Sequence, residues 1–190
     1  MGQPVTRAAL ALSALLFQRP GNVRSMEWGE VDLDGSMWTI PAEKMKRRVE
    51  AKVNGRPHFV PLAPQALAIL RDLQPLTGHG RFVFPSLRTG ERCMSENTVV
   101  AALRSMGYRN EDMSAQGFRA MARTLASERL NIAAEVIEAQ LAHGKAGPLG
   151  AAYDRAEFME QRRAMMTAWA DYLDRLREGA EVIELSSKRA

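Results

Sequence analysis

The chain has 190 residues, 46% hydrophobic and 25% charged, with a formal net charge of +4 and a single cysteine, Cys93. This composition is typical of a folded globular protein, and one cysteine excludes an internal disulfide framework and a cysteine-rich zinc module. No apolar run approaches the ~20 residues that a membrane span needs, and Arg7 interrupts the mildly apolar N-terminus, which no cleavage site follows. We therefore expect one cytoplasmic domain without a signal peptide.

The first half of the chain predicts helices beside one small antiparallel sheet. In chain order the expected elements are a helix over residues 5–17, strands over 37–40 and 58–62, a helix from residue 64 to about 73, and a short apolar stretch over 81–84. We expect Pro20 and Gly21 to end the first helix. Asn54-Gly55 is a turn signal between the two strands, so the segment before it would form a hairpin loop.

The predicted hairpin loop carries a concentrated positive charge. Against one acid, Glu50, residues 44–56 hold Lys44, Lys46, Arg47, Arg48, Lys52 and Arg56. A short basic stretch of this kind favours contact with phosphate groups. An ordinary solvated loop explains the same charges equally well.

The second half predicts helices over about 95–106, 114–129, 132–142 and 155–177. At ~100° per residue, the second of these places Gln116, Arg119 and Arg123 on one polar face, opposite Phe118 and Leu125. A plain solvent-exposed face is the alternative interpretation of that pattern. The fold class expected for the whole chain is mainly α, or α+β, with a small antiparallel sheet or hairpin.

The stretch between the last two predicted helices contains three glycines and a proline, which indicate a mobile connection. His143 begins this connection and Tyr153 ends it, so the two side chains could meet at one site. Considered singly, His143 suits the C-terminal end of a helix, where the dipole favours positive charge. Tyr153, considered singly, suits a half-buried packing position.

Several common catalytic sites are absent from the sequence. It has no G-x-x-x-x-G-K-[ST] loop, no H-E-x-x-H helix and no G-x-S-x-G elbow, and its three histidines lack the spacing of a zinc site. The remaining reactive groups are arginine, lysine, histidine and tyrosine. Such groups bind and protonate phosphate oxygens, and tyrosine adds an oxygen nucleophile.

Five motifs, in order along nearly the whole chain, resemble those of the tyrosine recombinases, or phage integrases, and above all their prophage and genomic-island branch. They are RPGNVR at residues 19–24 with Trp28 and VDL at 31–33, WTIPAEKMK at 38–46 with PHFVPL at 57–62, GFRAMARTL at 117–125, EAQLAH at 138–143, and AYDRA at 152–156 continued by RRAMMTAWADYL at 162–173. The resemblance implies a helical catalytic domain over residues 1–178 and a tail over 179–190 that docks on a neighbouring subunit or is disordered. In a full integrase, DNA-clamping domains precede this domain.

The resemblance also implies a phosphoryl-transfer site that needs no metal or cofactor. Arg19 and Arg119 would hold the non-bridging oxygens of a scissile DNA phosphate, since planar guanidinium groups suit that geometry. Tyr153 would attack phosphorus and leave a 3′-phosphotyrosyl enzyme with a free 5′-hydroxyl. Lys46 would protonate the departing 5′-oxygen, and His143 would donate a further hydrogen bond to the phosphate.

Two positions depart from the family pattern, which has histidine at Gln116 and glutamate at Asn22. We expect Gln116 to point into the phosphate site, where its amide donates a hydrogen bond but cannot take a proton from Tyr153. The further expected DNA contacts are Lys44, Arg47, Arg48, Lys52 and Arg123. Lys44 also competes with Lys46 for the role of general acid.

The function that follows from the resemblance is site-specific DNA recombination by strand cleavage and rejoining. The expected partner is double-stranded DNA with attachment sites, bound by a tetramer or another homo-oligomer at the nucleoid, without membrane contact. Three alternatives stay open. The first is a type IB topoisomerase, but the W-T-I-P and H-x-V-P-L flanks argue against it. The second is a catalytically impaired DNA-binding relic of an integrase, which Gln116 and Asn22 suggest. The third is a helical interaction protein without a role on DNA.

Overall fold

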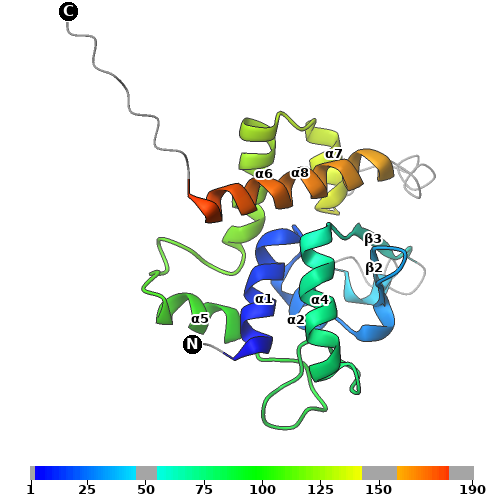
Figure 1. The fold of residues 1–190 in the computed structure, drawn as a ribbon, viewed down its shortest axis with the longest axis vertical. Coiled ribbons are helices and arrows are strands. Elements are labelled where there is room, and N and C mark those ends of the chain that lie inside the picture. Colours follow the sequence, from blue (N-terminus) through cyan, green and yellow to red (C-terminus); the bar gives the residue numbers. More distant parts are fainter. Residues whose placement is uncertain (1–2, 46–54, 143–157, 180–190) are drawn as a thin grey trace, which may run out of the picture.

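The structure is a computed structural model that describes residues 3–45, 55–142 and 158–179, and Figure 1 shows these residues as a bundle of helices beside one small sheet. The α-helices are α1 (Pro4–Leu15), α2 (Pro20–Arg24), α4 (Pro64–Thr77), α5 (Thr98–Ser105), α6 (Gly117–Leu130), α7 (Ala134–Gln140) and α8 (Met159–Glu178). Short 3₁₀ turns lie at Trp28–Glu30 and Ala42–Lys44. The predicted fold class, mainly α with a small antiparallel sheet, is confirmed.

Helix α1 lies at the centre of the packing, with α4 and α5 on either side and α6 and α8 across one end (Figure 1). Its Leu12, together with Leu16 and Phe17 beyond its end, belongs to one continuous hydrophobic core. The ring of Trp169 from α8 meets Phe17 edge to face at 5.4 Å, and its Nε1 donates a hydrogen bond to the Ala14 carbonyl at 2.9 Å. These contacts fix α8 over the C-terminal end of α1.

The chain turns between α1 and α2, and here the sequence-based prediction is wrong. The first helix ends at Leu15, whereas Pro20 is the first residue of α2 and Gly21 lies inside it. Proline suits the first position of a helix, because the N–H that it lacks has no helical partner there. Phe17 makes the turn with left-handed backbone, at a φ of 62°. Arg19 therefore stands at the start of α2, as its N-cap residue.

The sheet has three antiparallel strands in the order β1 (Val31–Asp32), β2 (Met37–Ile40) and β3 (His58–Pro61). Both predicted strands are present with ends within one residue of the prediction, and Trp38 pairs with Val60. Trp38, Ile40 and Val60 are buried, as the alternation of apolar residues predicts. The sequence gives no sign of β1, because two residues are too few to show an alternation. The predicted hairpin loop, with its turn at Asn54, lies outside the described residues.

The later helices are all present, with ends that differ from the predicted ones. α4 continues to Thr77 although Pro75 lies in its last turn. Tertiary contacts hold this turn, because Thr77 Oγ1 donates a hydrogen bond to the Val83 carbonyl at 3.0 Å and accepts one from Trp28 Nε1 at 3.2 Å. Residues 155–157 of the last predicted helix and the tail beyond residue 179 lie outside the described residues. None of the described helices is long and apolar enough to span a membrane.

The polar face predicted for α6 is wrong in one respect. The helix begins at Gly117, so Gln116 precedes it, and both Gln116 and Arg123 are exposed. Arg119 instead lies on the buried face beside Phe118 and is 5% exposed. The physical reason is that α6 packs against α1 and α7, where backbone carbonyl oxygens accept hydrogen bonds from the guanidinium group.

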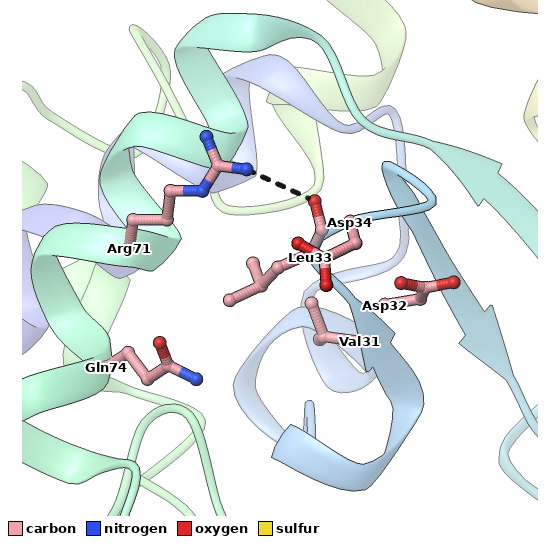
Figure 2. Close-up of a pocket in the computed structure, with 6 residues that line it drawn as sticks. All are labelled: Val31, Asp32, Leu33, Asp34, Arg71 and Gln74. Carbon is pink, nitrogen blue, oxygen red and sulfur yellow. Dashed lines mark hydrogen bonds between the residues drawn. The ribbon is translucent and has the colours of Figure 1, made fainter.

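A hollow of about 500 Å³ lies between α4 and the turn that follows β1 (Figure 2). Its lining residues are Val31, Asp32, Leu33, Asp34, Arg71 and Gln74. Arg71 Nη2 donates a long hydrogen bond, of 3.5 Å, to the Leu33 carbonyl. No residue of the predicted site lines this hollow, and two carboxylates against one guanidinium group make it unsuited to phosphate.

Candidate functional site

Among the predicted site residues that the structure describes, Arg119 is the most deeply buried. Its Nη1 donates a hydrogen bond to the Phe17 carbonyl oxygen at 2.6 Å, and its Nη2 donates one to the Leu141 carbonyl oxygen at 3.0 Å. Both acceptors are neutral, so these bonds fix the guanidinium plane without cancelling its charge. Through them α6 is joined to the chain just beyond α1 and just beyond α7.

Arg19 lies close enough to Arg119 to affect its ionisation. Burial is the main cause that lowers the pKa of Arg119 from 12.5 to about 10; the positive charge of Arg19 acts in the same direction and the carboxylate of Glu138 opposes both. Arg119 therefore stays protonated at neutral pH. Two neighbouring guanidinium groups that repel each other form a place where an anion is stabilised by both.

The bonds from Arg119 also hold two turns of left-handed backbone. Phe17 has a φ of 62°, and Ala142, which follows the second carbonyl acceptor, has a φ of 53°. Such conformations cost non-glycine residues roughly 1–3 kcal/mol and persist only where the surrounding structure imposes them. Phe17 lies two residues before Arg19, and Ala142 directly precedes His143. Arg119 thus shapes the backbone that leads to two other predicted site residues.

Residues of α2 contact both Arg19 and Met45, and Met45 lies near the start of the predicted hairpin loop. The backbone amides of Asn22 and Val23 donate hydrogen bonds to the Arg19 carbonyl at 2.9 and 3.0 Å. Asn22 is buried, and its Nδ2 lies 3.6 Å from the sulfur of Met45 as a weak hydrogen bond. Met45 directly precedes Lys46. An amide therefore occupies this contact, at the position where the family pattern has a carboxylate.

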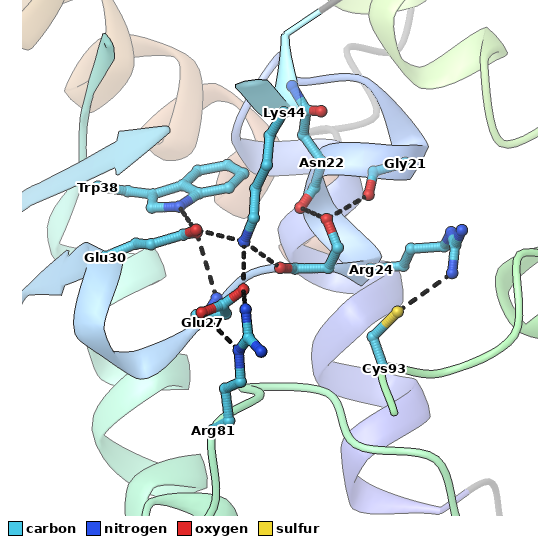
Figure 3. A network of polar contacts seen from close by, with 10 residues as sticks. Gly21, Asn22, Arg24, Glu27, Glu30, Trp38, Lys44, Arg81 and Cys93 are labelled. Atoms are coloured by element: carbon cyan, nitrogen blue, oxygen red, sulfur yellow. Dashed lines mark hydrogen bonds and ion pairs between the residues drawn. The ribbon is translucent and has the colours of Figure 1, made fainter. Parts of the chain in front are cut away.

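Lys44 lies at the centre of an ion-pair network (Figure 3). Its Nζ contacts the Ser25 carbonyl oxygen at 2.9 Å, Oε1 of Glu27 at 2.7 Å and Oε1 of Glu30. Arg81 Nε pairs with Oε2 of Glu27 at 2.8 Å. Hydrogen bonds from Arg81, the largest cause, and from Lys44 lower the pKa of the Glu27 carboxyl group, against the opposing effect of burial. The charge of Lys44 is therefore balanced within the protein.

Gln116 and Arg123 lie at the exposed surface of the α6 region. The Gln116 side chain makes no capping hydrogen bond to the helix, and the backbone carbonyl oxygen of Gln116 accepts a bond from the Arg119 backbone amide at 3.1 Å. Arg123 Nε pairs with Oε1 of Glu138, on α7, at 2.6 Å. The structure thus places Gln116 one helical turn before Arg119 along the chain, and it places Arg123 at a partly neutralised surface position.

Six residues of the predicted site lie outside the described residues: Lys46, Arg47, Arg48, Lys52, His143 and Tyr153. The described chain ends at Met45 before the first group and at Ala142 before the second. It resumes at Gly55 and at Phe158. The roles of these six residues therefore stay predictions.

Sequence reasoning missed a buried polar cluster, which consists of Gln18, His58, Gln140 and Arg162 and whose members are at most 9% exposed. A signal for it was available in the last helix. Arg162 shares helical spacing with the apolar Met165 and Trp169, and a charged residue is unusual on the inward face of a helix. No such signal marks Gln18 or Gln140.

The described residues gather cations rather than metal ligands. Within residues 3–45, 55–142 and 158–179, no group of three or more His, Cys, Asp or Glu side chains is placed to hold a metal ion. Arg19 at the start of α2 and Arg119 in α6 carry guanidinium groups that act on each other electrostatically. Guanidinium groups bind anionic oxygens through charge-assisted hydrogen bonds. The arrangement therefore suits an anionic ligand.

The match to a known protein family covers most of the chain. A family model described as "Phage integrase family" matches residues 3–158. The chain belongs to the phage integrase family.

Two curated relatives show how the chain compares with longer integrases. It is 39% identical over 180 residues to the integrase of Enterobacteria phage P4, which covers 91% of this chain and 41% of that protein. It is 37% identical over 183 residues to the prophage integrase IntA of Escherichia coli K12, with 96% of this chain and 42% of that protein covered. The chain thus spans less than half the length of these relatives.

A solved structure has the same fold. The integrase from mycobacterium phage Brujita matches with a TM-score of 0.64 over 89% of this chain and 52% of that chain. The sequence identity is 16%, so this likeness concerns the fold alone.

Proposed function

We propose that this chain is the catalytic part of a site-specific recombinase, which integrates DNA by cleaving and rejoining strands through a 3′-phosphotyrosyl intermediate. The observation that carries the proposal is the buried, charged Arg119 guanidinium group, on whose ionisation the charge of Arg19 acts. Two backbone carbonyl oxygens hold Arg119 in place, and it remains protonated, with a pKa of about 10. Membership of the integrase family supports a DNA phosphate as the anion that these arginines bind.

The proposed reaction is a transesterification at phosphorus. The Tyr153 oxygen forms a bond to the scissile phosphorus while the bond from phosphorus to the 5′-oxygen breaks. The tyrosine proton passes to water, because the Gln116 amide cannot accept it. Lys46 donates a proton to the departing 5′-oxygen. Attack of a second 5′-hydroxyl on the phosphotyrosyl ester reverses these steps and joins two strands.

The arginines would act on the charge that develops during this reaction. As the attacking oxygen approaches, negative charge increases on the non-bridging oxygens, and preorganised cations stabilise that charge without moving. Burial strengthens the effect, since the effective dielectric around Arg119 is lower than in water. His143 would add a hydrogen bond to the same oxygens. In this proposal positive side chains take the place of a metal ion.

We also propose that Arg47, Arg48, Lys52 and Arg123 contact the DNA backbone around the scissile phosphate. Lys44 is the weakest of the expected DNA contacts, because its amine already binds two carboxylates. The same contacts make Lys46 our preferred general acid.

The proposal extends to the whole assembly. The chain would act at the nucleoid as a tetramer or another homo-oligomer on attachment-site DNA. Residues 1–178 would form the catalytic domain, and residues 179–190 would dock on a neighbouring subunit or stay disordered. Size measurement of the protein alone and on attachment-site DNA tests the assembly.

A suicide substrate tests the reaction directly. DNA with a nick just beyond the cleavage position loses the short 5′-hydroxyl strand and traps the covalent enzyme. We expect an adduct in the presence of EDTA, and a mass shift that maps to Tyr153. Tyr153→Phe is the matched control, because it removes only the nucleophilic oxygen and should abolish the adduct while DNA binding stays nearly unchanged. An adduct that persists in Tyr153→Phe would assign the nucleophile to another residue.

A DNA-binding relic is the second candidate, and the exposed Gln116 at the start of α6 favours it, since no group there can take the tyrosine proton. Specific DNA binding without any adduct would support the relic. Relaxation of supercoiled DNA without strand exchange would support a topoisomerase instead. The absence of DNA binding at low salt would leave an interaction protein.

A further inference from the structure

The buried polar cluster joins four parts of the chain that are far apart in sequence. Gln18 lies between α1 and α2, His58 begins β3, Gln140 ends α7 and Arg162 lies in the first turn of α8. Figure 1 shows that this end of α8 lies beside α7, and both helices lie near β3. None of the four side chains has a part in the proposed chemistry.

Gln140 is the centre of the cluster and is fully buried. Its carbonyl oxygen accepts hydrogen bonds from Gln18 Nε2 at 2.7 Å and from His58 Nε2 at 3.1 Å. Its side-chain oxygen accepts a bond from Arg162 Nε at 2.9 Å, and its Nε2 donates a bond to the Leu16 carbonyl at 3.4 Å. One residue thus connects α7 with β3, α8 and the chain around the α1–α2 turn.

Arg162 extends these connections to the sheet. Besides its bond to Gln140, its Nη2 donates a hydrogen bond to the Phe59 carbonyl in β3. Arg162 is 5% exposed, and burying a guanidinium group is costly even where hydrogen bonds accompany it. An apolar side chain would attach α8 to the core at a lower cost. The planar group, with two bonds in fixed directions, instead fixes the orientation of α8 relative to α7 and β3.

Each element that the cluster joins leads to one residue of the proposed active site. Gln18 directly precedes Arg19, and Gln140 is followed after two residues by His143. β3 follows the loop that contains Lys46, and α8 follows the segment that contains Tyr153. A shift of α8 against α7 or β3 would therefore move the attachment points of separate catalytic groups relative to one another.

We propose that Arg162 is a positioning residue for strand cleavage: it sets the start of α8, and hence the segment that contains Tyr153, against α7 and β3. This inference rests on the proposed recombinase function. Arg162 acts through Gln140 and the Phe59 carbonyl and does not touch DNA. A misplacement of about 1 Å at a reacting group can cost on the order of a hundredfold in rate.

The test measures single-turnover adduct formation and DNA affinity separately, with the 190-residue chain and nicked DNA. Arg162→Met should slow adduct formation by about ten- to a hundredfold, because it removes the directed bonds and keeps an unbranched side chain. The dissociation constant for DNA should change less than about twofold, since the phosphate-binding arginines remain. Arg162→Lys keeps the positive charge but lacks the planar guanidinium group. Its rate of adduct formation should lie between those of Arg162→Met and the unmodified chain.

The matched control removes a different attachment of the same helix. Gln65, on α4, donates hydrogen bonds to Asp171 and Asp174 of α8 at 2.8 and 3.0 Å, and none of the three belongs to the cluster. Gln65→Met should lower the unfolding midpoint but leave the rate of adduct formation unchanged. Equal slowing by Gln65→Met and Arg162→Met would show that Arg162 only stabilises the fold, and would overturn the proposal.

A double-mutant cycle tests whether Arg162 acts through Gln140. Gln140→Met should also slow adduct formation, and the double variant should be no slower than the slower single variant, because both changes remove the same bond. If the two rate effects multiply independently, Arg162 does not act through Gln140. If Arg162→Met does not fold, Arg162→Lys and Gln140→Met carry the test. An unmodified chain that forms no adduct refutes the proposed function, whereas a normal adduct with unchanged variant rates refutes only the positioning role.

Discussion

Two cationic side chains of this protein have opposite electrostatic surroundings. Arg119 donates hydrogen bonds to two neutral carbonyl oxygens, the charge of Arg19 repels it, and the carboxylate of Glu138 partly offsets that repulsion. Lys44 contacts two carboxylates, Glu27 and Glu30, and a carbonyl oxygen. Both side chains belong to motifs that suggest phosphate binding, but Lys44 binds carboxylates directly, whereas the two carbonyl contacts of Arg119 carry no opposite charge.

The comparison shows that the number of positively charged residues in a motif does not predict which of them can bind an anion. Backbone carbonyl groups orient a guanidinium group and leave its unit charge available to an anion. Carboxylates orient an ammonium group and cancel its charge at the same time. We therefore expect changes at Arg119 and its neighbours to act on the reaction, and changes at Lys44 to act on stability.

The largest expected difference is between Lys46 and Lys44. Lys46→Met should slow strand cleavage by about 10²–10⁴-fold, the usual contribution of a general acid. A 5′-bridging phosphorothioate should restore the rate, because its leaving sulfur needs no proton. Lys44→Met should leave cleavage within about a fewfold of the unmodified rate, since its amine is held by carboxylates. Rescue of Lys44→Met by the phosphorothioate would instead assign the acid to Lys44 and remove the contrast.

Arg119→Met comes next in expected size. It removes a buried charge from the proposed phosphate site and should slow adduct formation by about 10²–10³-fold, as the loss of one preorganised donor does elsewhere. It also leaves the Phe17 and Leu141 carbonyl groups without this donor, so the unfolding midpoint should fall. Arg129→Met, at an exposed position on the same helix, is the control and should change neither quantity. Normal cleavage by Arg119→Met would place the phosphate elsewhere.

Sequence periodicity predicts the elements of this fold better than the contacts between them. Strands β2 and β3 and the long helices follow from alternation and helical spacing, whereas β1 does not. Pro20 is ambiguous, because proline both ends helices and begins them. The burial of Arg119 depends on a carbonyl group 102 residues away, and the bond from Gln18 to Gln140 spans 122 residues. No local pattern contains such pairings; the helical spacing of Arg162 indicates an inward-facing charge but not the residues that it contacts.

Gln116→His should have a moderate effect on the rate of adduct formation, and it tests the proposed role of the position just before Arg119. A histidine at this exposed position can take the proton of Tyr153 and should speed adduct formation roughly tenfold, part of the usual contribution of a general base. The pH–rate profile should gain an ionisation near 6.5. Gln116→Asn, which also lacks a proton-accepting group, should show no such ionisation. An unchanged or slower rate in Gln116→His would mean that the site is adapted to the amide.

The smallest expected effect concerns the acid stability of the Lys44 network. Arg81, first, and Lys44 hold the pKa of Glu27 below its ordinary 4.5 in the folded chain, and the unfolded chain lacks both partners. As the pH falls below about 4.5, the unfolded state therefore binds the proton first, and stability is lost until the pH has passed the lowered pKa of the folded state. Above pH 4.5 this contribution is fully present.

Lys44→Met should weaken this dependence, because it removes one of the two partners that favour the ionised carboxylate. Urea unfolding between pH 6 and pH 3 would measure it, with ionic strength held constant. At pH 6 the variant should be less stable by about 1–3 kcal/mol, since hydrogen bonds to charged groups are lost. The difference should shrink as the pH falls through the lowered pKa of Glu27, because a protonated carboxyl group no longer attracts the Lys44 ammonium group. Arg88→Gln removes one exposed charge outside the network and corrects for the change in net charge. A constant difference over this range would show that Lys44 stabilises the protein by packing rather than by its ion pairs, and the contrast with Arg119 would then no longer be electrostatic.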